Sequence, residues 1–301
     1  LPAMRPLVRA CDHSITLADG RDLGFAEYGD PTGFPVFYFH GGLSSRIDAT
    51  SADPAASAAG IRVIAPDRPG IGLSDRHRGS SLLDWPRDVA ELADHLGLSR
   101  FAVMGWSGGG AHAAACGYQL AEHVTSTTLI ASVIPPDWPG MMKQINQMDR
   151  IIIKLSRRAD FVDKAIFHAA RGLANQAPKQ FAERTASRLC EQSSNAVTRN
   201  PEEFAQATVA GLAQPAGVLD DFRIWDRPWG FDVAEIPGPV QVWHGDLDEF
   251  CPPEWGQRVV DAIPTARLHA VPGAGHFVAR DYWAEIFAAI APNPGGSNEG
   301  R

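Results

Sequence analysis

The stretch around Ser107 constrains the fold of this chain more than any other. An apolar, strand-like run at residues 101–104 is followed by Gly105-Trp-Ser-Gly-Gly-Gly110, and a helix-like segment begins at Ala111. Gly-x-Ser-x-Gly between a strand and a helix is the context of a nucleophile elbow, a strained turn that exposes the serine hydroxyl at the sheet edge. Glycine beside the serine lets neighbouring backbones approach closely. The alternative is a glycine-rich turn in which the serine is incidental.

Other short apolar runs extend this pattern along the chain. A hairpin is predicted from Ser14 to Tyr28, with its turn at Asp19-Gly20. A helix is predicted from Leu83 to Leu96, ending at Gly97. The further predicted strands are 35–39, 61–65, 101–104, 127–131, 240–243 and 266–271. Near-continuous apolar runs that alternate with helices predict an α/β fold, a mostly parallel eight-stranded sheet flanked by helices.

Residues 135–239 interrupt this alternation with helical periodicity and no convincing strand. Predicted helices there are 141–156, 159–173, 179–192 and 201–212. The chain is therefore predicted to have an α/β core (residues 1–134 and 240–301) and a helical cap (135–239). The cap has enough apolar residues to roof a cavity: Trp138, Met141, Met142, Met148, Ile151, Ile152, Phe161, Phe167, Trp225 and Trp229. Substrate contacts are predicted for Trp138 and Met142 of the cap and for Leu43 and Trp106 of the core.

Composition excludes several classes of function. The 301 residues carry a net charge of −8 with no basic cluster, which argues against nucleic acid or an anionic membrane as partner. No apolar run is long enough to cross a bilayer, and Leu1 to Cys11 lack the apolar core of a signal peptide, so a cytoplasmic location is expected.

The four cysteines form no C-x-x-C pair, so neither a disulfide framework nor a metal site is indicated. The expected partner is a small-molecule substrate, bound without a cofactor by a monomer or homodimer, and the tail after Pro292 is expected to be disordered.

A second glycine-rich turn complements the Ser107 motif. His40-Gly-Gly-Leu43 follows an apolar run, where backbone N–H groups can point at a developing oxyanion. The predicted oxyanion donors are the amides of Gly108 and Gly42, with Leu43 as second choice for the latter. The alternative is a glycine turn that serves backbone geometry alone.

An acid and a histidine follow later strands. Asp246 and Asp248 come directly after the run at 240–243, and Asp248 is preferred as the acid that orients a catalytic histidine, with Asp246 in reserve. His276 lies in a glycine-flanked loop after the last strand and is the predicted base for Ser107. The order Ser, Asp, His is the one expected for this architecture. His40 and His244 are predicted to be hydrogen-bonded structural histidines, and the Cys251 thiol, which has no obvious activating base, is not expected to be a nucleophile.

These motifs together resemble the α/β-hydrolase fold family, in its serine-nucleophile branch with a helical cap after the sixth strand. The resemblance runs from the hairpin near Ser14 to the last helix near Ala291, and it includes Asp67-Arg-Pro-Gly-Ile-Gly-Leu-Ser74, similar to the family's D-x-x-G-x-G-x-S segment. It implies a catalytic triad of Ser107, Asp248 and His276. Dehalogenases and epoxide hydrolases of this fold are excluded, because they need a carboxylate nucleophile. Glycine after Ser107, where proline-specific aminopeptidases usually carry tryptophan, argues against that activity.

The expected function is a serine hydrolase that cleaves a carboxylic ester, lactone or related acyl bond of a small, partly apolar molecule through an acyl-enzyme. Because a fold does not fix a function, two alternatives stay open. The same triad could serve acyltransfer, perhydrolysis or carbon–carbon bond hydrolysis. The chain could also be a non-catalytic homologue that only binds a ligand.

Overall fold

The predicted eight-stranded sheet is confirmed. The computed structural model describes residues 11–157 and 160–290, so the predictions for the first ten residues and for the tail lie outside the described residues. The strand order is β1-β2-β4-β3-β5-β6-β7-β8; β1 and β2 are antiparallel to their neighbours, and the other pairs are parallel. The strands are β1 (Cys11–Thr16), β2 (Asp22–Gly29), β3 (Phe34–Phe39), β4 (Ile61–Pro66), β5 (Phe101–Trp106), β6 (Val124–Ile130), β7 (Val240–Gly245) and β8 (Ala266–Val271).

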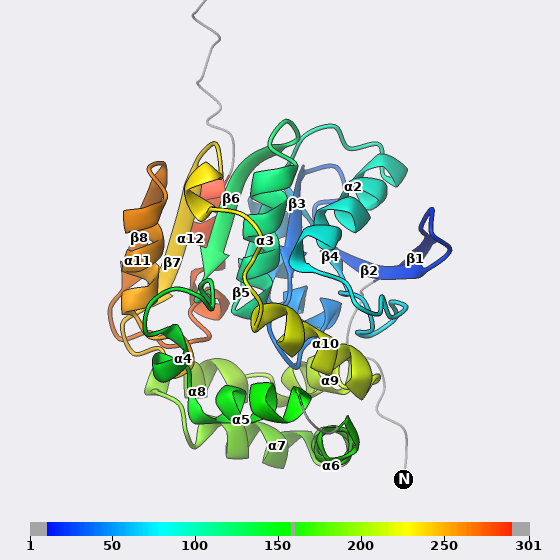
Figure 1. Ribbon diagram of the computed structural model, residues 1–301, viewed down its shortest axis with the longest axis vertical. Coiled ribbons are helices and arrows are strands. Elements are labelled where there is room, and N and C mark those ends of the chain that lie inside the picture. Colours follow the sequence, from blue (N-terminus) through cyan, green and yellow to red (C-terminus); the bar gives the residue numbers. More distant parts are fainter. Residues whose placement is uncertain (1–10, 158–159, 291–301) are drawn as a thin grey trace, which may run out of the picture.

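Helices cover both faces of the sheet and create two apolar layers. One layer packs against α2 (Trp85–His95), α3 (Gly108–Gln119) and α11 (Glu254–Ala262), and the other against α1 (Asp53–Ala58) and α12 (Ala279–Ile290). Figure 1 shows α3 and α11 in front of the sheet and α12 behind it. All six residues of β5 are buried, as expected for a strand with parallel neighbours and helices on both faces. The end of β5 is thereby held rigidly in the middle of the sheet.

In the described part of the segment between β6 and β7, seven α-helices precede a 3-10 helix at Val233–Glu235 and are here called the cap helices. They are α4 (Met141–Gln144), α5 (Gln147–Ser156), α6 (Asp160–Gln176), α7 (Pro178–Ala186), α8 (Glu191–Thr198), α9 (Pro201–Gly211) and α10 (Pro215–Trp225). In Figure 1 they lie together beyond the end at which β6 terminates. No strand occurs in the described part of residues 131–239. The domain boundaries at residues 135 and 239 stay a prediction.

The cap helices differ from the sequence prediction at three places. The single helix predicted at 141–156 is broken, because the Asn146 side chain accepts a hydrogen bond from the backbone N–H of Asp149 (2.9 Å) and so caps the start of α5. The helix predicted at 179–192 ends at Ala186, and α8 begins at Glu191. Helix α10, which starts with Pro215 in its first turn, was not predicted.

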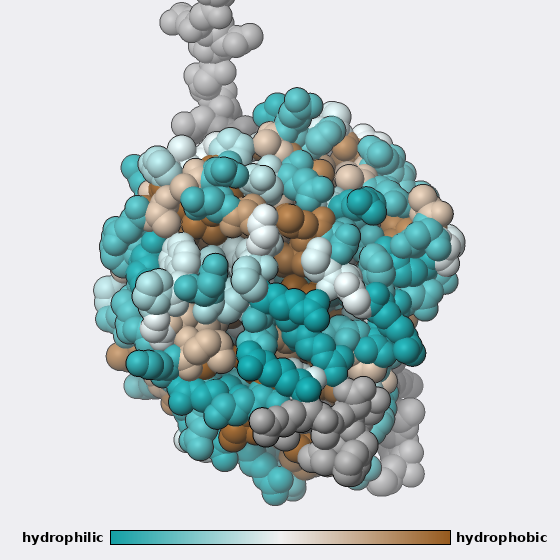
Figure 2. All heavy atoms as spheres, viewed as in Figure 1, coloured by the Kyte–Doolittle hydropathy of each residue, from teal (hydrophilic) through white to brown (hydrophobic). Residues whose placement is uncertain are grey.

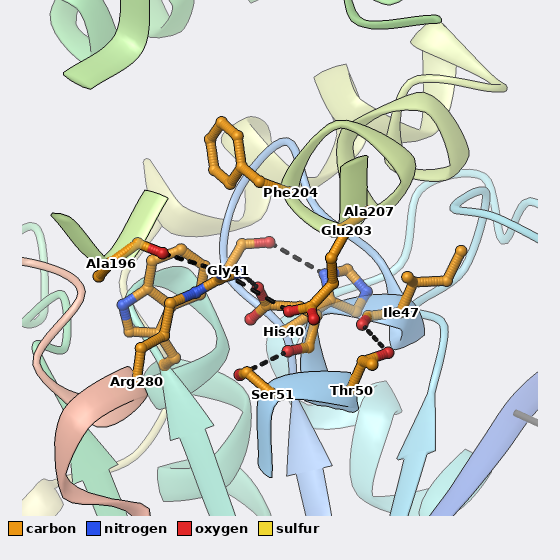
Figure 3. Close-up of polar contacts among 12 residues, drawn as sticks. His40, Gly41, Ile47, Thr50, Ser51, Ala196, Glu203, Phe204, Ala207 and Arg280 are labelled. Carbon is orange, nitrogen blue, oxygen red and sulfur yellow. Dashed lines mark hydrogen bonds and ion pairs between the residues drawn. The ribbon is translucent and has the colours of Figure 1, made fainter. Parts of the chain in front are cut away.

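A buried ion cluster joins the cap helices to the sheet (Figure 3). Arg280 of α12 donates to Asp48 Oδ1 (3.0 Å), in a 3-10 helix at Arg46–Ala52, and lies 3.6 Å from Glu203 Oε1 of α9. Burial raises the pKa of Glu203, and the charge of Arg280 opposes this shift. The Ser45 hydroxyl adds a hydrogen bond to the carbonyl of Ala207 (3.0 Å). These contacts fix α9 against the segment that follows β3.

The surface carries few large apolar patches in the view of Figure 2, where hydrophilic side chains predominate and apolar ones appear between them. Among the described helices, none combines the length and hydropathy that a bilayer crossing requires. The cytoplasmic location expected from the sequence stays a prediction.

Candidate active site

Ser107 sits at the sharp turn between β5 and α3. Its backbone has φ +55° and ψ −123°, a left-handed conformation that is strained for any residue other than glycine. Its N–H donates to the carbonyl of Ile130 (2.9 Å), and its own carbonyl accepts from the N–H of Gly110 (3.0 Å). A Cβ at Gly109 would overlap the carbonyl oxygen of Phe39, so glycine is required there. The chain therefore has the geometry expected of a nucleophile elbow.

His276 and Asp248 meet at the ends of the neighbouring strands. Asp248 follows β7, His276 follows β8, and His276 Nδ1 lies 3.0 Å from each carboxylate oxygen of Asp248. The carboxylate also accepts hydrogen bonds from the N–H groups of Phe250 (2.8 Å) and Cys251 (2.9 Å). Asp246, the reserve acid, is exposed and accepts from the N–H of Gly273 (2.7 Å) instead. Of the two candidate acids, Asp248 is the one that contacts His276.

The environment of Asp248 keeps its carboxylate ionised. Burial alone would raise its pKa, but the charge and hydrogen bonds of His276 and His244 outweigh burial and hold the pKa of Asp248 well below its usual range. An ionised Asp248 selects the tautomer in which His276 Nδ1 carries hydrogen, which leaves Nε2 as a proton acceptor.

His244 is a contact that the sequence analysis missed. Its Nε2 lies 3.3 Å from Asp248 Oδ2 and 2.9 Å from the carbonyl oxygen of Cys251. The sequence interpretation gave His244 a structural role only. The sequence feature that could have indicated this contact is the position of His244 near the end of β7, four residues before Asp248.

The Ser107 hydroxyl lies near the thiol of Cys251, whose pKa it lowers slightly, and within the described ranges no hydrogen bond joins the hydroxyl to His276. Such catalytic hydrogen bonds are often long in ligand-free enzymes, and rotation about the Ser107 side-chain bond changes its partner. Burial, followed by the charges of Asp248 and Asp149, raises the pKa of Cys251 well above its usual range. The thiol is therefore protonated, which is consistent with the prediction that Cys251 is not a nucleophile.

The predicted oxyanion donors lie beside Ser107. Gly42, Leu43 and Gly108 line the same cavity as Ser107, and Leu43 has φ +58°. The indole of Trp225, in α10, covers both glycines: a Cβ at Gly108 would overlap its ring, and one at Gly42 would lie 3.2 Å from it. One cap residue therefore packs against both glycines whose amides are the predicted oxyanion donors.

Arg68 connects the glycine loop (residues 40–43) to the same cap helix. Its fully buried guanidinium donates to the carbonyl oxygens of His40 and Gly41, the latter at 3.1 Å, and pairs with Asp221 of α10 at 2.9 Å. It also lies 5.6 Å from the ring centre of Trp225. Burial raises the pKa of Asp221, and Arg68 opposes that shift. We interpret Arg68 and Asp221 as positioning residues that fix the glycine loop against α10.

Replacing Asp221 with asparagine tests this interpretation. The variant leaves Arg68 without its counter-charge, so the glycine loop loses its fixed position, and kcat is expected to fall by about 10- to 100-fold with a small change in KM. Ester hydrolysis measures both constants. The control is Asp220→Asn, because Asp220 pairs with Arg76 and does not contact the loop. Equal effects of the two variants, or a rise in KM alone, would contradict the positioning role.

A cavity of about 610 Å³ opens over Ser107 and His276 between the sheet and the cap helices. Leu43 and Trp106, the predicted substrate contacts of the core, line this cavity, and the Trp106 indole N–H also donates to the carbonyl of His276 (2.9 Å). Much of the remaining lining is apolar: Met141, Ile145, Ile152, Phe167, Leu212, Phe222 and Phe277.

The structure places Trp138 and Met142, two of the predicted substrate contacts, outside this cavity. Neither belongs to its lining among the described residues. The Trp138 ring instead lies 5.1 Å from the guanidinium of Arg258, and Met142 packs against the main apolar core. Their neighbour Met141 faces the cavity.

The entrance to the cavity is apolar. Met148 and Ile151 of α5 and Ile166 of α6 line the cavity, yet they are 44%, 47% and 52% exposed. Exposed apolar side chains that continue into an apolar cavity are typical of a ligand entrance.

One group in the described part of the chain has metal-ligand atoms close together: Asp248, Cys251 and His276, within 4.8 Å of one another. These residues do not fit a metal ion. The carboxylate oxygens of Asp248 already accept several hydrogen bonds, and the Cys251 thiol keeps its proton. The expectation that the site uses no metal stays a prediction.

Comparison with known proteins agrees with this architecture. Residues 33–290 match the model of the "Alpha/beta hydrolase family". The chain is 26% identical over 273 residues to a 2-hydroxymuconate semialdehyde hydrolase of Pseudomonas putida, covering 87% of this chain and 86% of that protein. It is 25% identical over 251 residues to a proline iminopeptidase of Clostridioides difficile, covering 77% and 80%.

A solved structure gives the same result for the fold. The thermophilic esterase from Thermogutta terrifontis superposes with a TM-score of 0.68 at 24% identity, over 94% of this chain and 97% of that one. The relatives support a hydrolase role and differ in what they act on. With its sheet order, its strained serine turn and a family match over most of its length, the chain belongs to the alpha/beta hydrolase family.

Proposed function

We propose that the chain is a serine hydrolase that cleaves a carboxylic ester, a lactone or a related acyl bond of a small, partly apolar molecule. The observation that carries this proposal is the convergence of Ser107, on its strained turn, with His276 in one cavity, while Asp248 holds His276 Nδ1 at 3.0 Å. The apolar lining and entrance support an apolar portion of the substrate.

The proposed reaction begins when Ser107 Oγ attacks the carbonyl carbon and passes its proton to His276 Nε2. The carbonyl oxygen becomes an oxyanion, which the amides of Gly42 and Gly108 stabilise. The ionised Asp248 stabilises the imidazolium and remains ionised itself. The tetrahedral intermediate collapses, the bond to the leaving group breaks, and His276 returns its proton to that group.

The second half of the reaction repeats these steps with water. His276 takes a proton from water, the hydroxide adds to the acyl carbon, and the ester bond to Ser107 breaks. Ser107 Oγ regains its proton from His276, and the free acid leaves. The active site is thereby restored without any change in oxidation state.

A second candidate is hydrolysis of a carbon–carbon bond, which the similarity to 2-hydroxymuconate semialdehyde hydrolase supports. Acyltransfer and perhydrolysis use the same residues with an alcohol or hydrogen peroxide in place of water. A cytoplasmic location fits each of these activities.

A rapid-mixing experiment with p-nitrophenyl butyrate tests the proposal. An acyl-enzyme predicts a burst of p-nitrophenol of about one equivalent per enzyme whenever deacylation is the slower step, followed by steady release of butyrate. Added methanol would divert the acyl group to methyl butyrate in an acyltransferase, whereas a hydrolase forms mainly free acid. Folded protein that releases no p-nitrophenol would contradict hydrolysis of this ester and favour a carbon–carbon hydrolase or a ligand-binding protein.

A further inference from the structure

The carboxylate of Asp149 faces the proposed reaction centre from the cap side. Asp149 is the third residue of α5 and lines the same cavity as Ser107 and His276. Its Oδ2 accepts a hydrogen bond from Asn146 Nδ2 (2.6 Å). This carboxylate has no part in the proposed reaction.

Asp149 forms no ion pair with a lysine or arginine among the residues that the structure describes, and the charge that acts on it is that of His276. The other cavity-lining acid, Asp48, is neutralised by Arg280 at 3.0 Å. Arg188 also lines the cavity, but its side chain is largely exposed to solvent and forms no ion pair with Asp149 in the described ranges. Within the described ranges, no lysine or arginine therefore pairs with the Asp149 carboxylate in the cavity.

The surroundings of Asp149 act on its ionisation in opposite directions. Burial raises the pKa of Asp149, while the hydrogen bond from Asn146 and the charge of His276 oppose the shift. The N-terminal end of α5 also favours a negative charge. A carboxylate among apolar side chains loses hydration, and a ligand cation that approaches it recovers part of that lost free energy.

Capping of α5 does not account for the position of Asp149. Its backbone N–H already caps the helix through Asn146 Oδ1. A side chain needed only for capping would be equally effective facing solvent, whereas this one lies in a cavity lined largely by apolar residues such as Ile145, Ile152 and Phe167.

We propose that Asp149 binds a cationic group, an ammonium, carried by the substrate at the end that enters the cap side of the cavity. The inference rests on the proposed serine hydrolase function and adds a substrate class to it: acyl compounds with an apolar portion and a positive charge. Asp149 is then a specificity-determining residue, because it contacts the substrate away from the reacting carbonyl.

Three p-nitrophenyl esters of similar acyl shape test this inference. They are the esters of 4-(trimethylammonio)butanoate, which is cationic, of 5,5-dimethylhexanoate, its neutral isostere, and the monoester of glutarate, which is anionic. The wild-type protein is expected to have the highest kcat/KM for the cationic ester. The quantity compared is kcat/KM for the cationic ester divided by kcat/KM for the neutral ester. Asp149→Asn is expected to lower this ratio by about tenfold or more, because the substitution removes one close charge pair from a partly desolvated site. The control Asp137→Asn removes the same charge from an exposed residue outside the cavity lining and should leave the ratio unchanged.

Each other outcome overturns the inference. A ratio unaffected by Asp149→Asn means that Asp149 does not contact the acyl charge, and preference for the glutarate monoester means that Arg188, not Asp149, selects the substrate.

If the wild-type protein hydrolyses none of the esters, the proposed function fails, and calorimetry with the corresponding N,N-dimethylamides tests Asp149 separately. Binding of the cationic amide at least about tenfold more tightly than the neutral one, lost in Asp149→Asn, supports the site. Equal binding overturns it.

Discussion

Replacing Ser107 with alanine is expected to lower kcat for ester hydrolysis by about 10⁴- to 10⁶-fold. Without the Oγ nucleophile no acyl-enzyme forms, and the amides of Gly42 and Gly108 can assist only direct attack by water. The measurement is p-nitrophenol release from a neutral ester, with circular dichroism and thermal unfolding to show that the variant is folded. Alanine fits the site sterically, although it must still adopt the left-handed backbone of residue 107.

The Cys251 thiol provides a specific alternative to this expectation. It lies near the Ser107 hydroxyl and within 4.8 Å of ligand atoms of Asp248 and His276, so it is a side chain of the site that could attack a carbonyl. If Ser107→Ala retains activity within about tenfold of the wild type, the nucleophile lies elsewhere. The double variant Ser107→Ala, Cys251→Ala would then show whether the thiol is responsible.

Replacing Asp248 with asparagine is expected to lower kcat by about 10³- to 10⁴-fold while leaving KM within a few-fold of the wild-type value. The amide removes the charge that stabilises the His276 imidazolium. Its N–H₂ can also donate to Nδ1, which favours the tautomer that has hydrogen on Nε2 and cannot accept the Ser107 proton. Steady-state hydrolysis of the neutral ester measures the effect.

Asp246→Asn is the matched control for this prediction. Asp246 lies two residues earlier in the same loop, but its carboxylate accepts from Gly273 and is exposed. Its replacement should change kcat by no more than about twofold, as for a surface substitution outside the site. A larger loss for Asp246→Asn than for Asp248→Asn would reverse the assignment of the acid.

The fold could be predicted because its signals are local. Each strand is a short apolar run, and glycine or proline marks many of the turns between strands, so all eight strands appear close to their predicted positions. The candidate residues Ser107, Asp248 and His276 could be found for a related reason. Each follows a strand of the parallel part of the sheet, and the carboxyl ends of parallel strands lie at one edge.

The cap side of the cavity could not be predicted in the same way. Met141 lines the cavity and the adjacent Met142 does not, although both are apolar residues of α4, so their sequence could not distinguish them. Helical periodicity identifies an apolar face but not the surface that it packs against.

Ion pairs between residues far apart in the chain also could not be predicted from the sequence. Arg68 and Asp221 are 153 residues apart, and neither has a local pattern that indicates the other. Whether Asp149 forms an ion pair likewise depends on which cations the fold places near it, and the described residues supply no lysine or arginine partner. Such contacts result from tertiary packing of separate segments, and a single sequence contains no direct record of them.

Labelling with a fluorophosphonate tests the central claim most directly. The reagent phosphonylates an activated serine with loss of fluoride, and tryptic mass spectrometry locates the adduct. A serine hydrolase with the proposed site predicts one equivalent of adduct on the peptide that contains Ser107, with labelling greatly slowed in Asp248→Asn and absent from Ser107→Ala. Folded protein that takes up no reagent, or that carries the adduct on Cys251 or on another serine, would contradict the account.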